Sequence, residues 1–164
     1  MSYKEKHIEP SIVSEPMAAY GTQSSASPFN GLLSGVKPFN LSSDFNIVQL
    51  TRQGLPKRVL LSLIKKISLT LQELAHVMHI SERTFQRYDN DDIVKAEYAE
   101  KAIELARLYT RGDEVFGSMD KFKIWVRTPS VIFNGESPLS LLDTSAGFDM
   151  VFTELGRIEH GIFA

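Results

Sequence analysis

The sequence contains no cysteine, and this absence removes several classes of protein at once. Disulfide scaffolds, cysteine-ligated zinc sites and thiol catalysis are excluded. Long apolar runs are also missing, since stretches such as Val59-Leu60-Leu61 are far too short to cross a membrane. The opening residues carry charge with no apolar stretch behind them, so we expect no secretory signal and a cytoplasmic protein.

A strong overall charge is missing as well, because 18 basic and 20 acidic side chains leave a net charge of −2. The charges are unevenly placed. Residues 46–95 carry eight Lys or Arg against five acids, whereas residues 96–164 carry seven against eleven. Affinity for DNA depends on local neutralisation of phosphates rather than on the sum over the chain. A basic middle and an acidic end indicate two surfaces with different partners, with scattered surface charge as the simpler alternative.

The spacing of apolar residues predicts an all-α fold in three parts. Residues 1–45 are rich in Ser, Gly, Pro and Asn without a sustained period, which is typical of a flexible extension. We expect a helix-turn-helix domain over residues 46–112 and a small helical domain over residues 113–164. The expected helices run from Pro56 to about Lys66, from caps at Thr70 and Ser81, over Lys95–Arg111 with Gly112 as the stop, from a cap at Asp120 to Trp125, from Ser137-Pro138 to about Leu142, and from Thr144 to about Glu159.

The stretch from Leu71 to Tyr88 has the layout of a helix-turn-helix, in which two helices are joined by a turn of three or four residues. Ala75 is small enough for the point where the helices cross, and Ser81 is placed to cap the second helix. The turn position that is usually Gly is His79, one of the residue types that tolerate a positive φ at lower cost. Apolar residues supply the inner faces: Leu74, Met78, Ile80, Phe85 and Tyr88.

If those residues point inward, the opposite face of the second helix carries side chains suited to a DNA groove. Arginine can bind guanine through two hydrogen bonds, and glutamine can bind adenine in the same way. We therefore expect Arg83 and Gln86 to read bases, and Thr84 and Arg87 to be shared between bases and phosphates. Further candidates for phosphate contact are Ser81, Lys57 and Arg58. The alternative is an ordinary helical hairpin whose arginines are only solvated.

No pattern of catalytic or cofactor-binding residues stands out. His76 and His79 are three residues apart, but no third ligand follows at a sensible spacing, so we expect surface or turn histidines and no metal site. The acids Asp91 and Asp92 stand in a polar linker, where capping of the next helix is the better interpretation. The sequence therefore predicts a binding protein without a cofactor, and not an enzyme.

The C-terminal third contains an ordered series of short signals that a DNA reader does not need. They are Val115-Phe116-Gly117, Trp125 followed by Pro129, Asn134-Gly135 leading into Ser137-Pro138-Leu139, Leu141-Leu142-Asp143-Thr144, Gly147, and Leu155-Gly156-Arg157-Ile158-Glu159-His160-Gly161. With these residues and the helix-turn-helix before them, the chain from about Gly54 to Ala164 resembles the Xre/MbcA/ParS family of type II antitoxins. Residues 1–45 have no counterpart in that resemblance.

The resemblance implies a function in two parts. Antitoxins of this kind dimerise and repress their own operon through DNA binding. Their C-terminal domain covers the active-site entrance of a toxin with the RES fold, which consumes NAD⁺. Carried onto this chain, the toxin-binding residues are expected at the tail: Arg157, Glu159, His160, Gly161 and Phe163. For Phe163 the alternative is a terminal side chain folded back on its own core.

Two other functions remain open at this point. One is a helix-turn-helix transcriptional regulator whose C-terminal domain only dimerises and that has no toxin partner. The other is an interaction module that has lost DNA binding. A neighbouring gene for a RES-type toxin would favour the antitoxin, and binding of the chain to its own promoter would exclude the interaction module.

Overall fold

The computed structural model describes residues 28–34 and 44–161, and within those ranges every regular element is a helix, with one isolated bridge between Pro56 and Ile93. In chain order the elements are α1 (Pro28–Leu32), α2 (Asp44–Gln53), α3 (Lys57–Ile67), α4 (Leu71–Val77), α5 (Glu82–Gln86), α6 (Ala96–Phe116), α7 (Met119–Trp125), the 3-10 helices η1 (Val131–Phe133) and η2 (Pro138–Leu141), and α8 (Ser145–Glu159). The all-α prediction is confirmed. None of these helices is long and apolar enough to span a bilayer.

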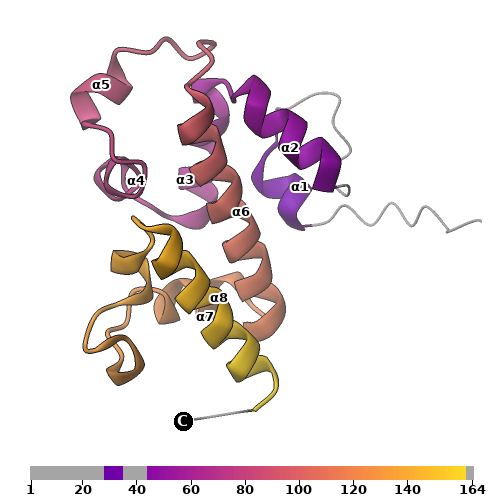
Figure 1. Cartoon of the computed structure of the whole chain (residues 1–164), viewed down its shortest axis with the longest axis vertical. Coiled ribbons are helices and arrows are strands. Elements are labelled where there is room, and N and C mark those ends of the chain that lie inside the picture. Colours follow the sequence, from indigo (N-terminus) through magenta and orange to yellow (C-terminus); the bar gives the residue numbers. More distant parts are fainter. Residues whose placement is uncertain (1–27, 35–43, 162–164) are drawn as a thin grey trace, which may run out of the picture.

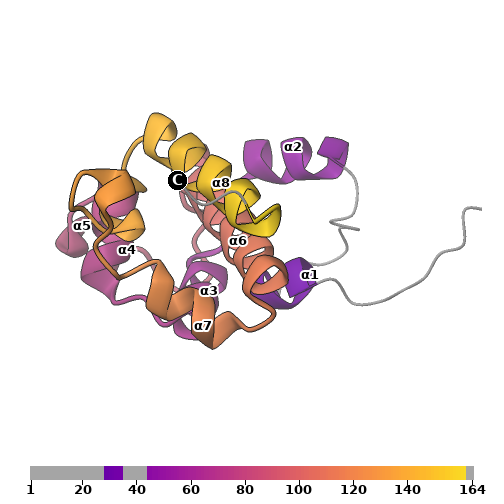
Figure 2. The same ribbon diagram turned by 90° about the horizontal axis from the view of Figure 1, so that it is seen from below.

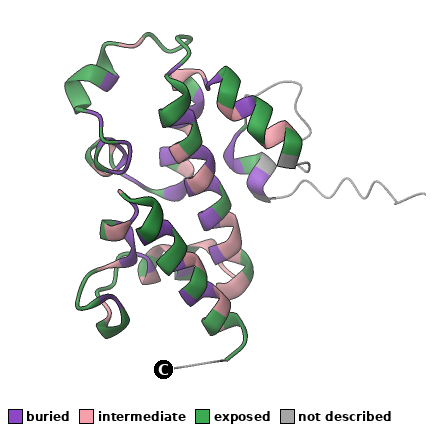
Figure 3. Ribbon diagram, in the orientation of Figure 1, coloured by how far each residue is buried: buried purple, intermediate pink, exposed green. Residues whose placement is uncertain are grey.

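The long helix α6 is the axis around which the other helices are arranged (Figure 1). α1, α2 and α3 contact it in the upper part of that view, and α7 and α8 contact it in the lower part. Seen from below, α6 runs between these helices (Figure 2), and the buried positions gather along it and along the sides that face it (Figure 3). The buried residues form one cluster that runs from Phe29 to Leu155. The two halves of the chain therefore share a single core.

Helix α6 is longer than the sequence predicted, and Gly112 does not end it. Gly112 is buried inside the helix, and a Cβ atom placed there would lie 2.2 Å from the ring of Phe122 in α7. The missing side chain is what allows α7 to cross α6 so closely. The helix ends instead at Gly117, which has a left-handed φ of 64° that favours glycine. The expected boundary at residue 112 thus falls inside a continuous helix.

Four of the helix starts predicted from Ser or Thr are confirmed. In each, the side chain accepts the backbone N–H of the residue three positions later. These capping residues are Thr70, Ser81, Ser137 and Thr144.

Three other expected starts were wrong by one or two residues. Lys95 precedes α6 as its N-cap and is not its first helical residue. Pro56 lies just before α3 with an extended ψ of 141°, and is not its first helical residue. Asp120 lies in the first turn of α7, which Ser118 precedes.

The short helix α1 lies in the stretch expected to be a flexible extension. Its apolar side chains Phe29 and Leu32, together with Leu33, are buried, and α1 contacts α3 and α6. Lys66 of α3 also donates hydrogen bonds to the carbonyl of Gly31 and to the hydroxyl of Ser34. Residues 28–34 therefore belong to the core, and composition missed them because three apolar side chains suffice to anchor one turn. The rest of the expected extension lies outside the described residues.

Candidate functional site

The turn between α4 and α5 has the geometry that the sequence pattern predicted. His79 adopts a positive φ of 51°, which directs the chain from the end of α4 into the Ser81 cap of α5. The backbone N–H of Ile80 donates to the carbonyl of Ala75 over 3.0 Å and closes the turn. Tyr88 is the one side chain expected on the inner faces that is only half-buried. The others are buried: Leu74, Ala75, Met78, Ile80 and Phe85. The two helices therefore pack as a unit and leave one side of α5 free.

The free side of α5 and its two caps carry five of the seven residues that the sequence assigned to DNA. Arg83 and Arg87 are exposed, and neither guanidinium has an ion-pair or hydrogen-bond partner in the described part of the chain. The exposed Ser81 hydroxyl lies 2.7 Å from that of Thr84 and accepts its backbone N–H at 3.0 Å. Gln86 is exposed as well. The arrangement offers two unneutralised cations beside hydroxyl and amide groups, which suits phosphates and base edges.

Lys57 and Arg58, which the sequence also assigned to DNA, are both engaged within the protein. The Lys57 ammonium donates to the carbonyl oxygens of Tyr88 at 2.6 Å and Gln86 at 3.3 Å, and it lies 5.5 Å from the centre of the Phe85 ring. A cation at the last carbonyls of a helix is favourable because those oxygens carry partial negative charge. Lys57 thus pins the end of α5 to α3. Arg58 forms an ion pair with Asp91 in the loop before α6.

The C-terminal half is attached to both ends of α4, and no local signal in the sequence pointed to this. At the start of α4, Arg127 forms an ion pair with Glu73 and donates to the carbonyl of Ser68 over 2.7 Å. At its end, His79 Nε2 lies 2.7 Å from the carbonyl oxygen of Asp143, which accepts a hydrogen bond. The partners are 54 to 64 residues apart in the sequence. Because α4 packs against α5, these contacts also position α5 and the side chains on its free side.

Glu73 has a second role in the same place, as the acid of a capping box. The backbone N–H of Thr70 donates to its carboxylate over 2.7 Å, and the Thr70 hydroxyl accepts the Glu73 N–H over 3.1 Å. Partial burial by itself raises the pKa of Glu73, but the hydrogen bonds from Arg127 and Thr70 outweigh it and hold the pKa below its ordinary value. The carboxylate is therefore charged at neutral pH and bridges the two halves.

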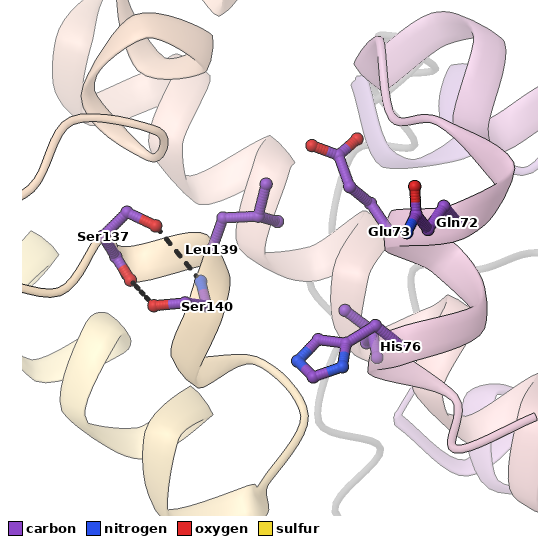
Figure 4. A pocket seen from close by; sticks show the side chains of 7 residues that line it. Gln72, Glu73, His76, Ser137, Leu139 and Ser140 are labelled. Carbon is purple, nitrogen blue, oxygen red and sulfur yellow. Dashed lines mark hydrogen bonds between the residues drawn. The ribbon is translucent and has the colours of Figure 1, made fainter.

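Between these two attachments lies a hollow of about 340 Å³. Gln72, Glu73 and His76 of α4 line one side of it (Figure 4). The other side is lined by Ser137, which precedes η2, and by Ser140 within η2. The described residues contain no group of three side chains able to hold a metal ion. The hollow is thus a seam between the halves, and its exposed walls are mainly apolar although several lining residues are polar.

The tail residues expected to bind a toxin lie at the C-terminal end of α8. Arg157 Nη1 is 3.5 Å from Glu154, a buried carboxylate that is only 5% exposed, so Arg157 also compensates a charge inside the fold. Glu159 forms an ion pair with Arg111 of α6. His160 and Gly161 follow and are exposed. Phe163 lies outside the described residues.

Comparison with known proteins divides the chain into two matched segments. Residues 47–107 match the family described as the antitoxin Xre-like helix-turn-helix domain. Residues 111–161 match the antitoxin Xre/MbcA/ParS C-terminal toxin-binding domain. The two segments meet inside α6.

Two curated relatives, both named antitoxin Xre, are similar to this chain along most of their length. The relative from Pseudomonas putida is 27% identical over 122 residues, which cover 74% of this chain and 76% of the relative. The relative from Yersinia enterocolitica is 29% identical over 121 residues, which cover 72% of this chain and 81% of the relative. The similarity therefore extends over both halves rather than over one shared module.

Proposed function

This chain belongs to the Xre/MbcA/ParS family of antitoxins, and on that premise we propose that it neutralises a RES-fold toxin that consumes NAD⁺ and represses its own operon. As an antitoxin with a helix-turn-helix and a toxin-binding domain, it acts by binding and is not an enzyme. The proposal adds the class of toxin, the operator, and a cytoplasmic location where both partners would be met.

The observation that carries the DNA-binding part is the outward face of α5. Two arginines without partners in the described structure stand beside Thr84 and Gln86, while the inner side of the same helix is fixed by Phe85. In helix-turn-helix proteins the first residues of the second helix reach deepest into the major groove. We assign base reading to Arg83 and Gln86 and phosphate contact to Ser81, and we expect Thr84 and Arg87 to be shared between bases and phosphates. Lys57 contributes mainly by holding the end of α5.

A homodimer follows from the same assignment. One short recognition helix covers few base pairs, and proteins of this class bind as two-fold pairs whose half-sites are about 34 Å apart. We therefore expect a palindromic operator and two copies of the chain on it.

The toxin-binding part is supported by the matched domain and by charge. Residues 96–164 carry seven basic against eleven acidic side chains. A toxin pocket that binds the pyrophosphate of NAD⁺ is expected to be electropositive, so an acidic domain would be steered towards it. At the end of α8, His160 and Gly161 are the described tail residues that form no close ion pair within the fold. Nε2 of His160 lies 4.0 Å from the Glu159 carboxylate, which is a marginal distance for an ion pair.

The operator assignment is tested by a mobility-shift titration on the chain's own promoter at fixed salt. Arg83→Ala removes two hydrogen bonds to a base and should cost about 1–3 kcal/mol of binding free energy. Lys65→Ala is the matched control, because Lys65 is an exposed cation on α3 outside the α5 face. Equal affinities for the two variants would remove Arg83 from the DNA site.

The toxin assignment is tested by growth rescue on co-expression with the product of the neighbouring toxin gene. A chain that ends at Glu159 keeps the Arg157 and Glu159 ion pairs and loses only the residues after them. We expect it to lose rescue and to retain its operator affinity. Full rescue by that shortened chain would contradict the assignment of His160, Gly161 and Phe163 to the toxin contact. A neighbour that consumes no NAD⁺ would contradict the RES class.

A further inference from the structure

The most exposed large apolar side chain in the described structure is in η1, between α7 and η2. Val131 is 94% exposed and its neighbour Ile132 is 45% exposed. The third residue of the same turn, Phe133, is buried and packs against Trp125 with 6.3 Å between the ring centres. One aromatic side chain therefore anchors the turn, and two β-branched side chains are held out in water.

The turn that presents these side chains is tightly hydrogen-bonded. The Ser130 carbonyl accepts the N–H groups of Phe133 at 3.0 Å and Gly135 at 2.9 Å, and the Ser130 N–H donates to Glu136 at 3.0 Å. Asn134 and Gly135 have positive φ values of 56° and 85°, which close the loop within six residues. Valine and isoleucine also have few accessible rotamers. Little conformational freedom would be lost when a partner covers this surface, which favours binding.

We propose that Val131 and Ile132 form an apolar anchor that inserts into the surface of the toxin. This inference rests on the proposed function and adds a contact that the tail assignment lacks. The turn lies inside the segment that matches the C-terminal toxin-binding domain, residues 111–161. A toxin is therefore the partner that we expect at this surface. Exposure of two branched apolar side chains to water is unfavourable. Binding that buries them is favourable, because it transfers their apolar surface from water to the contact with the partner.

The position of η1 agrees with a toxin contact that leaves the operator face open. In Figure 1 the orange turn of η1 and the C-terminal end of α8 lie at the lower end of the molecule, and α5 lies at the upper end. A toxin bound across the lower end would contact the η1 anchor on one side and the tail on the other. The α5 face would stay accessible to DNA at the same time.

The experiment is a calorimetric titration of the full chain into the purified neighbouring toxin, inactivated by a point mutation. Val131→Ala should weaken binding about tenfold and Val131→Asp about hundredfold, since the aspartate would bury a charge in an apolar contact. Met150→Asp is the matched control, because Met150 is a half-exposed apolar residue of α8 in the same domain. Its affinity should stay within twofold of the unchanged protein.

Each outcome bears on the anchor separately from the proposed function. Absence of binding by the unchanged chain would contradict the toxin partner itself. Binding by that chain with an unaltered affinity for Val131→Asp would overturn the anchor alone. If Val131→Asp converts a dimer to a monomer in sedimentation while toxin affinity is unaltered, the surface contacts a second copy and the proposal is wrong. Circular dichroism should show the same melting temperature for all variants, as expected for an exposed site.

Discussion

The helices α5 and η1 are built on the same plan and present opposite chemistry. Each begins with a serine whose side chain accepts a backbone N–H, Ser81 in α5 and Ser130 in η1. Each buries one aromatic ring, Phe85 or Phe133, and exposes the residues around it. The exposed residues are charged and polar in α5, with the acidic Glu82 beside Arg83, but aliphatic in η1.

This comparison distinguishes the contacts that hold a short helix in place from the exposed side chains that would bind a partner. A capped turn with one buried aromatic is sufficient to display side chains rigidly, whatever their chemistry. Guanidinium and amide groups fit phosphates and base edges, whereas branched aliphatic groups fit an apolar protein surface. The two halves of this antitoxin would thus recognise a nucleic acid and a protein with one local design.

The largest effect is expected from removal of the two anchoring rings. Phe85→Ala and Phe133→Ala each delete a buried aromatic side chain, which costs about 3–5 kcal/mol of unfolding free energy at a well-packed site. The measurement is urea unfolding, followed by operator and toxin titrations of the folded fraction. We expect Phe85→Ala to impair operator binding and Phe133→Ala to impair toxin binding.

The control for both rings is Phe45→Ala, since Phe45 is 67% exposed on α2. The comparison would break down if Phe133→Ala left toxin affinity unaltered. It would also break down if Phe45→Ala cost as much free energy as the two buried rings.

An intermediate effect is expected at the junction, because α4 is tied to the C-terminal half and supports α5. Glu73→Gln keeps the shape of the side chain and removes its charge, and the loss of charged hydrogen bonds should cost about 1.5 kcal/mol at neutral pH. Operator affinity should fall with it, and toxin affinity should not. The measurement is urea unfolding across a pH series together with the two titrations.

The pH dependence of that difference has a definite sign. The pKa of Glu73 is lower in the folded protein than its ordinary value of 4.5. The stabilisation by this carboxylate is therefore present above pH 4.5 and is lost as the pH falls through the lower folded value. The two proteins should become equally stable in acid. Glu97→Gln is the control, since its ion pair with Lys95 is exposed and should contribute little. A gap that widened in acid would contradict this account.

The smallest effect is expected from the two serine caps. Ser81→Ala and Ser130→Ala each remove one side-chain acceptor from a helix start and should cost about 1 kcal/mol of unfolding free energy. Ser81→Ala should also lower operator affinity, because Ser81 is assigned to a phosphate. Ser130→Ala should lower toxin affinity, because the η1 anchor loses rigidity. If each variant changed the affinity for the other partner instead, the pairing of element and partner would be reversed.

Local sequence signals predicted most of the helix-turn-helix. The capping box at Thr70, the positive φ at His79 and the inward direction of Phe85 each follow from a few neighbouring residues, and each is confirmed. The side-chain roles on the outer face of α5 stay predictions, because exposure permits a contact with DNA without demonstrating one. The sequence did not predict the η1 anchor, because two apolar residues beside a phenylalanine could equally be buried in the core.

The boundary between the halves shows where such signals end. Gly112 and Gly117 are the same residue type five positions apart in one helix, and only the second ends it. The two glycines differ in their surroundings, because the ring of Phe122 occupies the space that a side chain at Gly112 would fill.

Short-range patterning was thus enough to specify the helices, their caps and the inward face of the helix-turn-helix, because those features depend on residues within one or two turns of each other. The continuous α6, the packing of α1, the use of Lys57 as a pin and the Arg127–Glu73 link depended on the folded chain. The residues that contact one another in these features are distant in the sequence. The packing of the helices decides which partner each charged side chain or glycine contacts.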